Sequence, residues 1–307
     1  MSVSLVTSNR YASGYLMSGR VQVKGFDIQF QPPTPTVAAV YTEQYHKQTY
    51  DAVDMPFSNY VVWRDLGKPV TAIPVFPTMF NPILGAMVNR QAGIKGPGDL
   101  VGKRVGVSGF GFNPAVWLRG ALVHQYDVPI EKITWVEGEP NSMMGVPFHR
   151  SSRFTIEKTS ENLMELLEQG KLDALVMSDG GVEPNDKVDR LFPDYMAEIR
   201  KYREATGVVP TNSVVTITEA ALKANPGIDR ALVDAYQEAW RLYVEESTPD
   251  AKHMELKVDD LKSMGVFPPK QGFKANRTAI NHLAHYVYEQ NLVRKLYEPE
   301  ELFSQVD

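Results

Sequence analysis

The chain has 307 residues, no cysteine and a formal net charge of −5, and 43% of its residues are hydrophobic. This length and composition are typical of a soluble globular protein with two domains, each able to bury its own core. The lack of cysteine excludes disulfides, thiolate nucleophiles and thiolate metal sites. Because no Lys/Arg-rich run is present, we expect no nucleic-acid partner, and no segment approaches the roughly 20 apolar residues that span a bilayer.

The first 90 residues or so alternate short apolar runs with helical patterns, which predicts parallel strands joined by crossover helices. We expect strands at residues 3–8, 27–31, 52–55, 70–76 and 84–89. The N-terminus has no signal-peptide pattern, so we expect a cytoplasmic protein and no membrane partner. Turn formers in residues 93–100 predict a domain boundary near Asn89.

The rest of the chain continues the alternation and then becomes helical. We expect strands at 104–108, 133–137 and 174–178, with helices at 114–126 and 160–169 between them. A strand at residues 213–218 then opens a C-terminal region with helices that include residues 226–246 and 276–297. The expected fold class is therefore α/β.

Four segments at predicted strand ends are candidates for ligand binding. In open α/β sheets, ligands bind beyond the carboxyl ends of strands, where helix N-termini offer free N–H groups. This rule selects Asn9-Arg10-Tyr11, residues 54–58, residues 108–113 and residues 178–181. Arg10 is thereby a candidate substrate-binding residue.

The loop at residues 108–113 is the strongest candidate of the four. Its glycines let the backbone approach a ligand, and Asn113-Pro114 is typical of a helix start. A substrate carboxylate is expected to bind the amides of Gly109, Phe110, Gly111, Phe112 and Asn113. The alternative is a tight strand-to-helix turn without a ligand. The glycine pattern is too incomplete to indicate a dinucleotide site.

Arg119 follows this loop within the predicted helix, close to Trp117. An arginine can bind a carboxylate through two parallel hydrogen bonds, which makes Arg119 a candidate substrate-binding residue. The alternative is that Trp117 packs in the core while Arg119 binds a structural carboxylate of the protein itself.

Asp54 and Ser58 lie at the end of a predicted buried strand. A carboxyl group in that position could donate a proton to carbon if desolvation raises its pKa. The alternative is that both side chains cap the following helix.

His149 lies in a loop between two predicted strands, and histidine titrates near neutral pH. It could enter the site on a lid and act as a general acid, or the loop could simply be exposed. The other histidines lie in helical patterns and are expected to pack or to face solvent, namely His46, His124, His253, His282 and His285.

The run Arg190-Leu-Phe-Pro-Asp-Tyr, continuing to Thr206-Gly-Val-Val-Pro210, resembles the 4,5-dihydroxyphthalate decarboxylase family. Further similar segments lie at residues 50–60, 115–120, 268–277, 286–290 and 299–303. The segment at residues 93–107 resembles the type II periplasmic-binding-protein fold. This resemblance implies a two-lobed fold with a ligand cleft between lobes, one lobe comprising residues 1–89 plus 210–307 and the other 90–209.

Several positions differ from the family pattern, and most of them replace a positive or titratable group with a neutral or acidic one. Asp54 stands where a glutamate is usual, and Ser213 stands where a histidine is expected. Phe80 matches the family, but neutral residues replace the basic cluster around it. Asp179 stands where relatives often carry an arginine, so it could accept hydrogen bonds from substrate hydroxyls, neutralise a cation or help hold a divalent metal. Asn212 and Ser213 are expected to face the site.

The family resemblance implies a cofactor-independent lyase that removes CO2 from a small hydroxylated aromatic carboxylate after protonation of a ring carbon, and the changed positions suggest a substrate less anionic than a phthalate. Its expected catalytic residues are Asp54, His149 and Asp179. The alternative is a non-catalytic solute-binding protein for a small organic acid, since fold does not fix function. No cofactor is expected, while a divalent metal at Asp54 and Asp179 and a homo-oligomeric state are left open.

Overall fold

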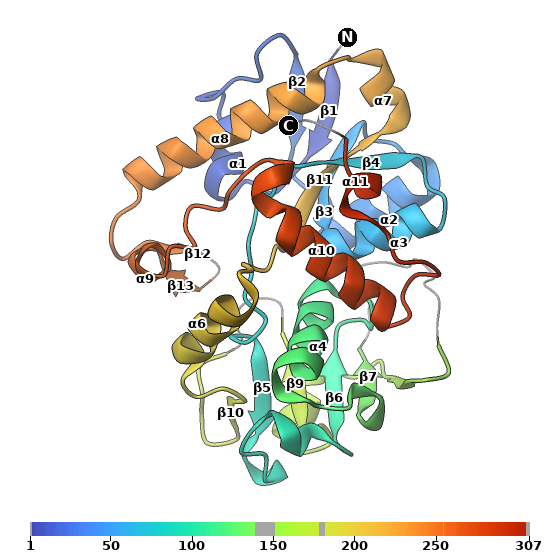
Figure 1. Cartoon of the computed structure of the whole chain (residues 1–307), viewed down its shortest axis with the longest axis vertical. Helices are drawn as coiled ribbons and strands as arrows, with labels where there is room; N and C mark the ends of the chain where they lie inside the picture. Colours follow the sequence, from blue (N-terminus) through green and yellow to red (C-terminus); the bar gives the residue numbers. More distant parts are fainter. Residues whose placement is uncertain (1, 139–150, 178–181, 254, 305–307) are drawn as a thin grey trace. The chain divides into compact units, whose positions relative to one another are not determined.

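The computed structural model describes residues 2–138, 151–177, 182–253 and 255–304 (Figure 1). The chain forms two compact units. The first unit comprises Met1–Met79, Thr211–His285 and Lys295–Asp307, and the second comprises Phe80–Pro210 and Tyr286–Arg294.

The first unit is built on a five-stranded sheet in the order β2-β1-β3-β11-β4. Strand β1 runs parallel to β2 and β3, whereas β11 runs antiparallel to β3 and β4. Every residue of β11 is buried, which suits its nearly continuous run of β-branched residues. The strands are β1 (Val3–Val6), β2 (Ile28–Gln31), β3 (Ala52–Pro56), β4 (Val70–Ile73) and β11 (Ser213–Thr218).

Helices of the first unit follow the strands and pack on the sheet. Thr36 and Thr218 begin α2 and α7 by accepting hydrogen bonds from the amides of Ala39 and Ala221. A short hairpin, β12 (Lys252–His253) and β13 (Leu256–Lys257), follows α8. The helices are α1 (Tyr11–Met17), α2 (Val37–Lys47), α3 (Phe57–Asp65), α7 (Glu219–Ala224), α8 (Ile228–Glu246), α9 (Val258–Ser263), α10 (Phe273–Glu289) and α11 (Pro299–Leu302).

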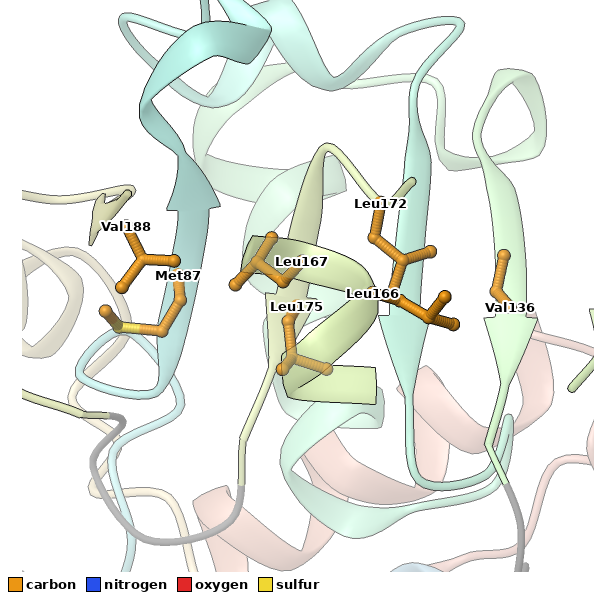
Figure 2. Packing of buried hydrophobic residues seen from close by; sticks show 7 residues of the cluster. All are labelled: Met87, Val136, Leu166, Leu167, Leu172, Leu175 and Val188. Carbon is orange, nitrogen blue, oxygen red and sulfur yellow. The ribbon is translucent and has the colours of Figure 1, made fainter. Parts of the chain in front are cut away.

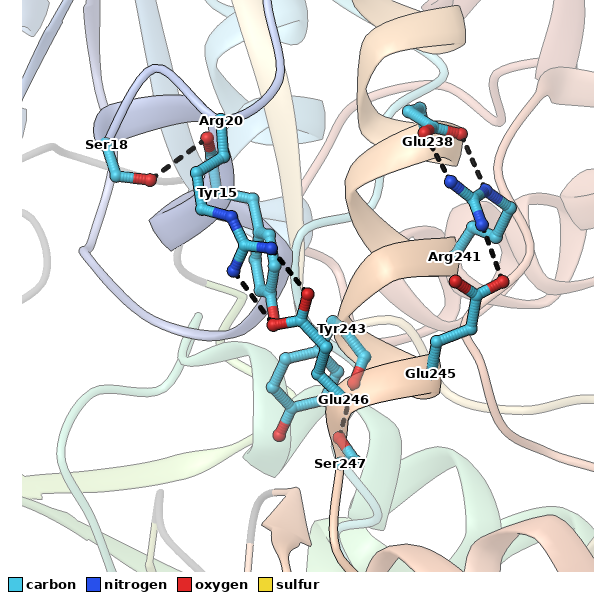
Figure 3. Close-up of polar contacts among 9 residues, drawn as sticks. All are labelled: Tyr15, Ser18, Arg20, Glu238, Arg241, Tyr243, Glu245, Glu246 and Ser247. Atoms are coloured by element: carbon cyan, nitrogen blue, oxygen red, sulfur yellow. Dashed lines mark hydrogen bonds and ion pairs between the residues drawn. The ribbon is translucent and has the colours of Figure 1, made fainter.

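Helices α1 and α8 pack against each other, and polar contacts join them at the surface (Figure 3). Glu246 at the end of α8 accepts hydrogen bonds from Tyr15 of α1, at 2.7 Å, and from Arg20, at 2.8 Å. Earlier in α8, Arg241 pairs with Glu238 and Glu245. Exposed pairs of this kind contribute at most about 1 kcal/mol each, so the buried face of α8 supplies most of the packing energy.

The second unit is built on a six-stranded sheet in the order β10-β5-β9-β6-β7-β8. Strands β9, β6, β7 and β8 are parallel, whereas β5 is antiparallel to its neighbours β9 and β10. The strands are β5 (Ala86–Asn89), β6 (Arg104–Val107), β7 (Thr134–Glu137), β8 (Thr155–Lys158), β9 (Ala174–Val176) and β10 (Val188–Arg190). The helices are α4 (Asn113–Tyr126), α5 (Leu163–Glu168) and α6 (Tyr195–Thr206), with short 3-10 turns η1 (Arg90–Ala92), η2 (Pro97–Leu100) and η3 (Ile130–Lys132).

One face of this second sheet is covered by α5 through a leucine-rich core (Figure 2). Asn162 begins α5 by accepting hydrogen bonds from the amides of Met164 and Glu165. Each fully buried leucine stabilises the fold by about 1.5–3 kcal/mol. The core residues are Met87, Val136, Leu166, Leu167, Leu172, Leu175 and Val188.

The motif that carries the family resemblance forms the two ends of α6. Asp194 accepts a hydrogen bond from the amide of Ala197 at 3.0 Å and so caps the N-terminus of the helix. Gly207 closes the helix with a φ of 69°, a left-handed conformation that glycine adopts without steric cost. The Pro-Asp and Thr-Gly elements are therefore helix caps, and the structure gives them a folding role.

Two units built on separate α/β sheets agree with the expected fold class. The expected boundary near Asn89 differs from the observed grouping, because β5 hydrogen-bonds to β9 and β10 and therefore lies in the second sheet. Residues 286–294 also group with the second unit, where Tyr286 packs edge-on against Trp117 of α4. Within the described ranges, no helix is both long and apolar enough to cross a membrane.

Candidate functional site

Asp54 is a partly exposed residue near the carboxyl end of β3, opposite Val215 of β11. Strands β1 and β3 are parallel, so their carboxyl ends meet at the same edge of the sheet. The Oδ1 atom of Asp54 is inaccessible to solvent and has no hydrogen-bond partner in the described structure. A buried polar atom without a partner is rare and calls for an explanation.

The other oxygen of this carboxyl group is held by a hydroxyl. Thr7, directly after β1, donates a hydrogen bond from Oγ1 to Oδ2 of Asp54 at 3.0 Å. Tyr41 of α2 fixes the main chain by donating to the carbonyl oxygen of Asp54 at 3.1 Å. Residues from β1, β3 and α2 therefore converge at one edge of the first sheet.

Burial raises the pKa of Asp54 from its usual value of 3.8 to about 6, and hydrogen bonding to Ser213 and Thr7 lowers it by a smaller amount. Of these two hydroxyls, only that of Thr7 meets full hydrogen-bond geometry. No charged side chain in the described part of the chain contributes to the shift. A carboxyl group desolvated in this way keeps its proton close to neutral pH and can donate it.

A second set of polar groups adjoins Asp54 from β11 and the preceding loop. The hydroxyls of Ser213 and Thr78 are 2.9 Å apart, and the amide of Asn212 donates to Thr78 Oγ1 at 3.3 Å. The carbonyl of Asn212 accepts a hydrogen bond from the amide of Phe57, the first residue of α3, at 3.1 Å. The structure thus brings the predicted residues Asp54, Asn212 and Ser213 together within the first unit.

Ser58 and Arg10 belong to the same unit but differ in accessibility. Ser58 is fully buried in the first turn of α3, and its Oγ lies 3.3 Å from Oδ1 of Asn59. The cap of α3 is Pro56, with no side-chain cap, so the capping alternative for Asp54 and Ser58 is wrong. Arg10 is exposed at the start of α1. Whether either residue binds substrate stays a prediction.

In the second unit, the amide of Phe110 in the loop at residues 108–113 binds a carboxylate that belongs to the protein. It donates to Oε1 of Glu137, at the end of β7, at 2.7 Å. Gly109, Phe110, Gly111, Phe112 and Asn113 are all buried. The amide of Phe110 therefore binds Glu137, in the place where a substrate carboxylate is predicted. Binding of a substrate by this loop stays a prediction.

Arg119 is fully buried beside that loop. Its Nε donates to Gln290 at 2.7 Å, its Nη2 donates to the carbonyl of Phe110, and the guanidinium lies 4.0 Å from the centre of the Phe110 ring. Burial lowers the pKa of Arg119 to about 9, and the nearby charge of Glu137 opposes that shift. These are the contacts of a structural arginine, so its substrate-binding role stays a prediction without further support.

Three other predicted residues are not brought to Asp54 by the described structure. Phe80 is buried in the second unit, where its amide donates to the carbonyl of Pro210 at 3.2 Å. His149 and Asp179 lie outside the described residues. The metal site suggested for Asp54 and Asp179 stays a prediction, and within the described ranges no three His, Asp or Glu side chains gather as metal ligands do.

His253 has an unusual environment that the sequence did not indicate. It was expected in a helix, but it lies buried in the hairpin strand β12. The centre of its ring is 4.2 Å from the centre of the Tyr11 ring. Neither ring nitrogen has a partner with full hydrogen-bond geometry, although the backbone of Met79 lies nearby. Burial lowers the pKa of His253 to about 3, so the ring is neutral. Its neighbours come from α1 and α8, which no local pattern around residue 253 could reveal.

A hollow of about 330 Å³ lies elsewhere in the first unit, beside α8. It is lined by Gln237, Trp240, Arg241, Val244, Glu245, Pro268, Pro269 and Gln271. None of these residues belongs to the group around Asp54. Arg241 and Glu245 already pair with each other there, so we place the candidate site at Asp54.

Sequence comparisons relate the whole chain to decarboxylases. The sequence model of the NMT1/THI5-like family matches residues 22–147. A 4,5-dihydroxyphthalate decarboxylase of Comamonas testosteroni is 24% identical over 322 residues, which cover 99% of this chain and 96% of the relative. A 4,5-dihydroxyphthalate decarboxylase of Pseudomonas putida is 26% identical over 182 residues, covering 57% of this chain and 70% of the relative. The chain is thus a divergent relative of these enzymes.

Structural comparisons define the class of fold. The periplasmic sulfonate-binding protein SsuA of Methylobacillus flagellatus matches with a TM-score of 0.58 at 13% identity, over 99% of this chain and 92% of that one. SsuA of Escherichia coli, a periplasmic aliphatic sulphonate binding protein, matches with a TM-score of 0.52 at 14% identity, over 98% of this chain and 97% of that one. A Candida albicans protein with the generic periplasmic-binding-protein fold matches with a TM-score of 0.55 at 12% identity, over 100% of this chain and 96% of that one. The chain therefore has the α/β, two-lobed type II periplasmic-binding-protein-like fold, as the sequence predicts.

Proposed function

We propose that the protein is a decarboxylase-like lyase that acts on a small hydroxylated aromatic carboxylate, with Asp54 as the proton donor. The observation that carries this proposal is the Asp54 carboxyl group, whose Oδ1 is buried without a partner. Its pKa of about 6 results from burial and is not offset by a neighbouring cation. Similarity to a 4,5-dihydroxyphthalate decarboxylase along nearly the full length of both chains supports the reaction class.

The reaction needs one proton and one bond cleavage. A hydroxyl group ortho or para to the carboxylate makes the ring carbon that bears the carboxylate nucleophilic. Asp54 donates its proton to that carbon, the bond to the carboxylate breaks, CO2 leaves, and the bonding electrons restore the aromatic ring. Asp54 then regains a proton from solvent, so the balance is one carboxylate and one proton in, one arene and one CO2 out.

The groups around Asp54 suit a substrate with hydroxyls and little charge. Asn212, Ser213 and Thr78 offer neutral hydrogen-bond donors and acceptors beside the carboxyl group. A highly anionic substrate would raise the pKa of Asp54 further and would find no cation among these contacts. This is why the proposed substrate carries fewer negative charges than a phthalate.

The proposed roles of the remaining residues rest on the sequence alone. His149 is proposed as a second acid and Asp179 as a partner for substrate hydroxyls. Arg10, Ser58, Phe80, Arg119 and the loop at Gly109 to Asn113 are proposed as substrate contacts. The cytoplasmic location, the independence from cofactors and the oligomeric state likewise stay predictions.

A non-catalytic solute-binding protein for a small organic acid is the second candidate. The observation that favours it is the fold itself, because similar structures include sulfonate-binding proteins. A binding protein has no need of a protonated carboxyl group held free of partners, and a sulfonate is an anion that such a group would not attract. The chemistry at Asp54 therefore favours the enzyme.

The test is CO2 release from a panel of hydroxylated benzoates incubated with the purified protein, in parallel with Asp54→Asn. We expect turnover by the wild type and a loss of about 100-fold or more in the variant, because general acid catalysis contributes about 10²–10⁴-fold. Tight binding of a panel member by both proteins without any CO2 would establish the alternative. Equal turnover by both proteins would remove Asp54 from the mechanism.

A further inference from the structure

Strand β2 lies at one end of the first sheet, beside β1 (Figure 1). Across the described ranges, no strand pairs with its other side. The main-chain carbonyls of Asp27 and Gln31 accept hydrogen bonds from the β1 segment, at 2.8 and 3.0 Å. In this parallel ladder the odd-numbered residues of β2 therefore bond to β1. The main-chain N–H and C=O groups of Ile28 and Phe30 point to the open side.

The other edges of the two main sheets are either covered or charged. At the far edge of the first sheet, the C-terminal segment covers β4, to which the amide of Ser304 donates a hydrogen bond at 2.8 Å. In the second sheet, edge strand β8 carries Glu157 and Lys158. The opposite edge strand, β10, carries Asp189 and Arg190. Charged side chains on an edge strand oppose its pairing with another chain.

Strand β2 and the segment that follows it carry no charge. Residues 28–42 contain no Asp, Glu, Lys or Arg, although 22% of the whole chain is charged. None of residues 28–39 is buried, and Val37 at the start of α2 is 40% exposed. The longer uncharged run at residues 69–89 is different, because most of it is buried. An exposed segment depleted of charge is typical of a surface that meets a partner.

We propose that β2 pairs antiparallel with β2 of a second copy of this chain, around a two-fold axis at Gln29. The five-stranded sheets of the two first units then become one continuous sheet. Ile28 of one copy faces Phe30 of the other, and the outward N–H and C=O groups of each such pair exchange hydrogen bonds. The contact uses the same patch on both copies, as a closed two-fold dimer requires.

The side chains on both faces of the strand suit this register. On one face, Ile28 of one copy meets Phe30 of the other, and a β-branched residue opposite an aromatic one is a favourable cross-strand pair. On the other face, Gln29 meets Gln29 of the second copy. Asp27 there meets Gln31, whose amide can donate to the carboxylate. Two identical edges of this kind bring no like charges together, and this is why the proposed occupant is a second copy.

The proposed contact is small. Pro32 follows β2 and has no amide hydrogen to donate, so the pairing is limited to a strand of 4 residues. Stable interfaces bury about 1,200–2,000 Å² in total, and smaller ones are weak. We therefore expect a dimer in equilibrium with the monomer, half formed at a protein concentration on the order of 100 µM.

Disulfide cross-linking of the full chain tests the register. The chain has no cysteine, so Gln29→Cys places a single thiol at the proposed axis. Opposite residues of such a non-hydrogen-bonded pair have Cα atoms about 4.5 Å apart, within the range of about 4.4–6.8 Å that a disulfide spans. Gln31→Cys is the matched control on the same strand and face, because the two copies of that residue are about 13 Å apart in this register. We expect Gln29→Cys to form the disulfide dimer at least about tenfold faster under mild oxidation. Equal rates would overturn the proposal.

Charge exchange at Gln29 tests the same axis by sedimentation equilibrium. Gln29→Lys and Gln29→Glu each place two like charges opposite one another, so each should raise the dissociation constant of the dimer at least about tenfold. An equimolar mixture of the two variants should dimerise again, because unlike charges then meet. Gln91→Lys is the control, since Gln91 is an exposed glutamine of the second unit, and it should dimerise like the wild type.

Two results of the sedimentation experiment would also contradict the pairing of β2. One is a wild type that stays monomeric up to about 1 mM. The other is a dimer that Gln29→Lys leaves unchanged, which would place the contact on another surface. Equal midpoints of urea unfolding for the variants and the wild type, measured at low concentration, would show that loss of the dimer is not loss of folding. The pairing does not depend on the role of Asp54, and none of these measurements needs a substrate.

Discussion

Asp54 and Glu137 carry carboxyl groups near strand ends, one in each unit, and the surroundings of the two groups are opposite. Glu137 ends β7, accepts the amide of Phe110 at 2.7 Å and lies near the charge of Arg119. Asp54 near the end of β3 has only hydroxyls as side-chain partners and one oxygen without any. A carboxylate that is bound by an amide and lies near a cation is a stable part of the fold. One held by a single hydroxyl is poised to exchange a proton.

The strongest test of this comparison is Glu137→Gln. It removes the nearby negative charge that acts on the buried guanidinium of Arg119, and leaving a buried charge uncompensated costs about 3–5 kcal/mol. The measurement is the free energy of unfolding in urea. Glu157→Gln is the control, because Glu157 pairs with Arg104 at the surface, with both side chains nearly half exposed; its effect should stay below about 1 kcal/mol. Equal effects of the two changes would show that Glu137 is not a structural anchor.

Asp54→Asn should raise the free energy of unfolding at high pH, whereas Glu137→Gln lowers it. Burial raises the pKa of Asp54 to about 6, so the stability contributed by its protonated form is present below about pH 4 and is lost as the pH rises to about 6. The neutral amide avoids that loss. We expect similar unfolding free energies near pH 4 and a variant about 3 kcal/mol more stable near pH 8.

Asp51→Asn is the contrast for that measurement. Asp51 accepts hydrogen bonds from the amide and the hydroxyl of Ser4, at 2.9 and 3.0 Å. Its substitution should therefore destabilise the protein near pH 8. If Asp54→Asn were also destabilising there, Asp54 would be a structural carboxylate like Glu137.

The smallest expected effect is the pH dependence of turnover, which tests whether Asp54 donates the proton. An acid with a pKa of about 6 is half protonated near that pH, so kcat/KM, measured at substrate concentrations well below KM, should fall about tenfold for each pH unit above it. The measurement is the rate of CO2 release at several pH values. A rate that stays constant between about pH 5 and pH 8 would assign proton donation to another group.

Part of the site around Asp54 could be predicted because strand ends are visible in a sequence. The rule that ligands lie beyond the carboxyl ends of strands selected Asp54, and the position after Pro210 selected Asn212 and Ser213. Thr7 could not be selected in this way. It lies in an ordinary strand pattern, and its hydroxyl acquires a role only from Asp54, which is 47 residues away in the chain and 3.0 Å away in the fold.

The loop at residues 108–113 shows the opposite outcome. Its glycines and its helix start predict amides that bind a substrate carboxylate, and the amide of Phe110 binds a carboxylate of the protein instead. The sequence could not show that Glu137, 27 residues away, supplies a carboxylate to the amide of Phe110. Pairing between β6 and β7 aligns Val107 with Glu137 and brings the carboxylate to the loop.

The sequence by itself determined the α/β class and most strand positions, because periodicity acts over a few neighbouring residues, and the family resemblance implied the two-lobed fold. Only the tertiary structure decided which carboxyl group is bound by an amide and which is held by a hydroxyl. That distinction depends on burial and on contacts between residues far apart in the chain, such as Asp54 with Thr7 and Glu137 with Phe110. Desolvation raises the pKa of a carboxyl group only where the fold excludes water and supplies no compensating charge.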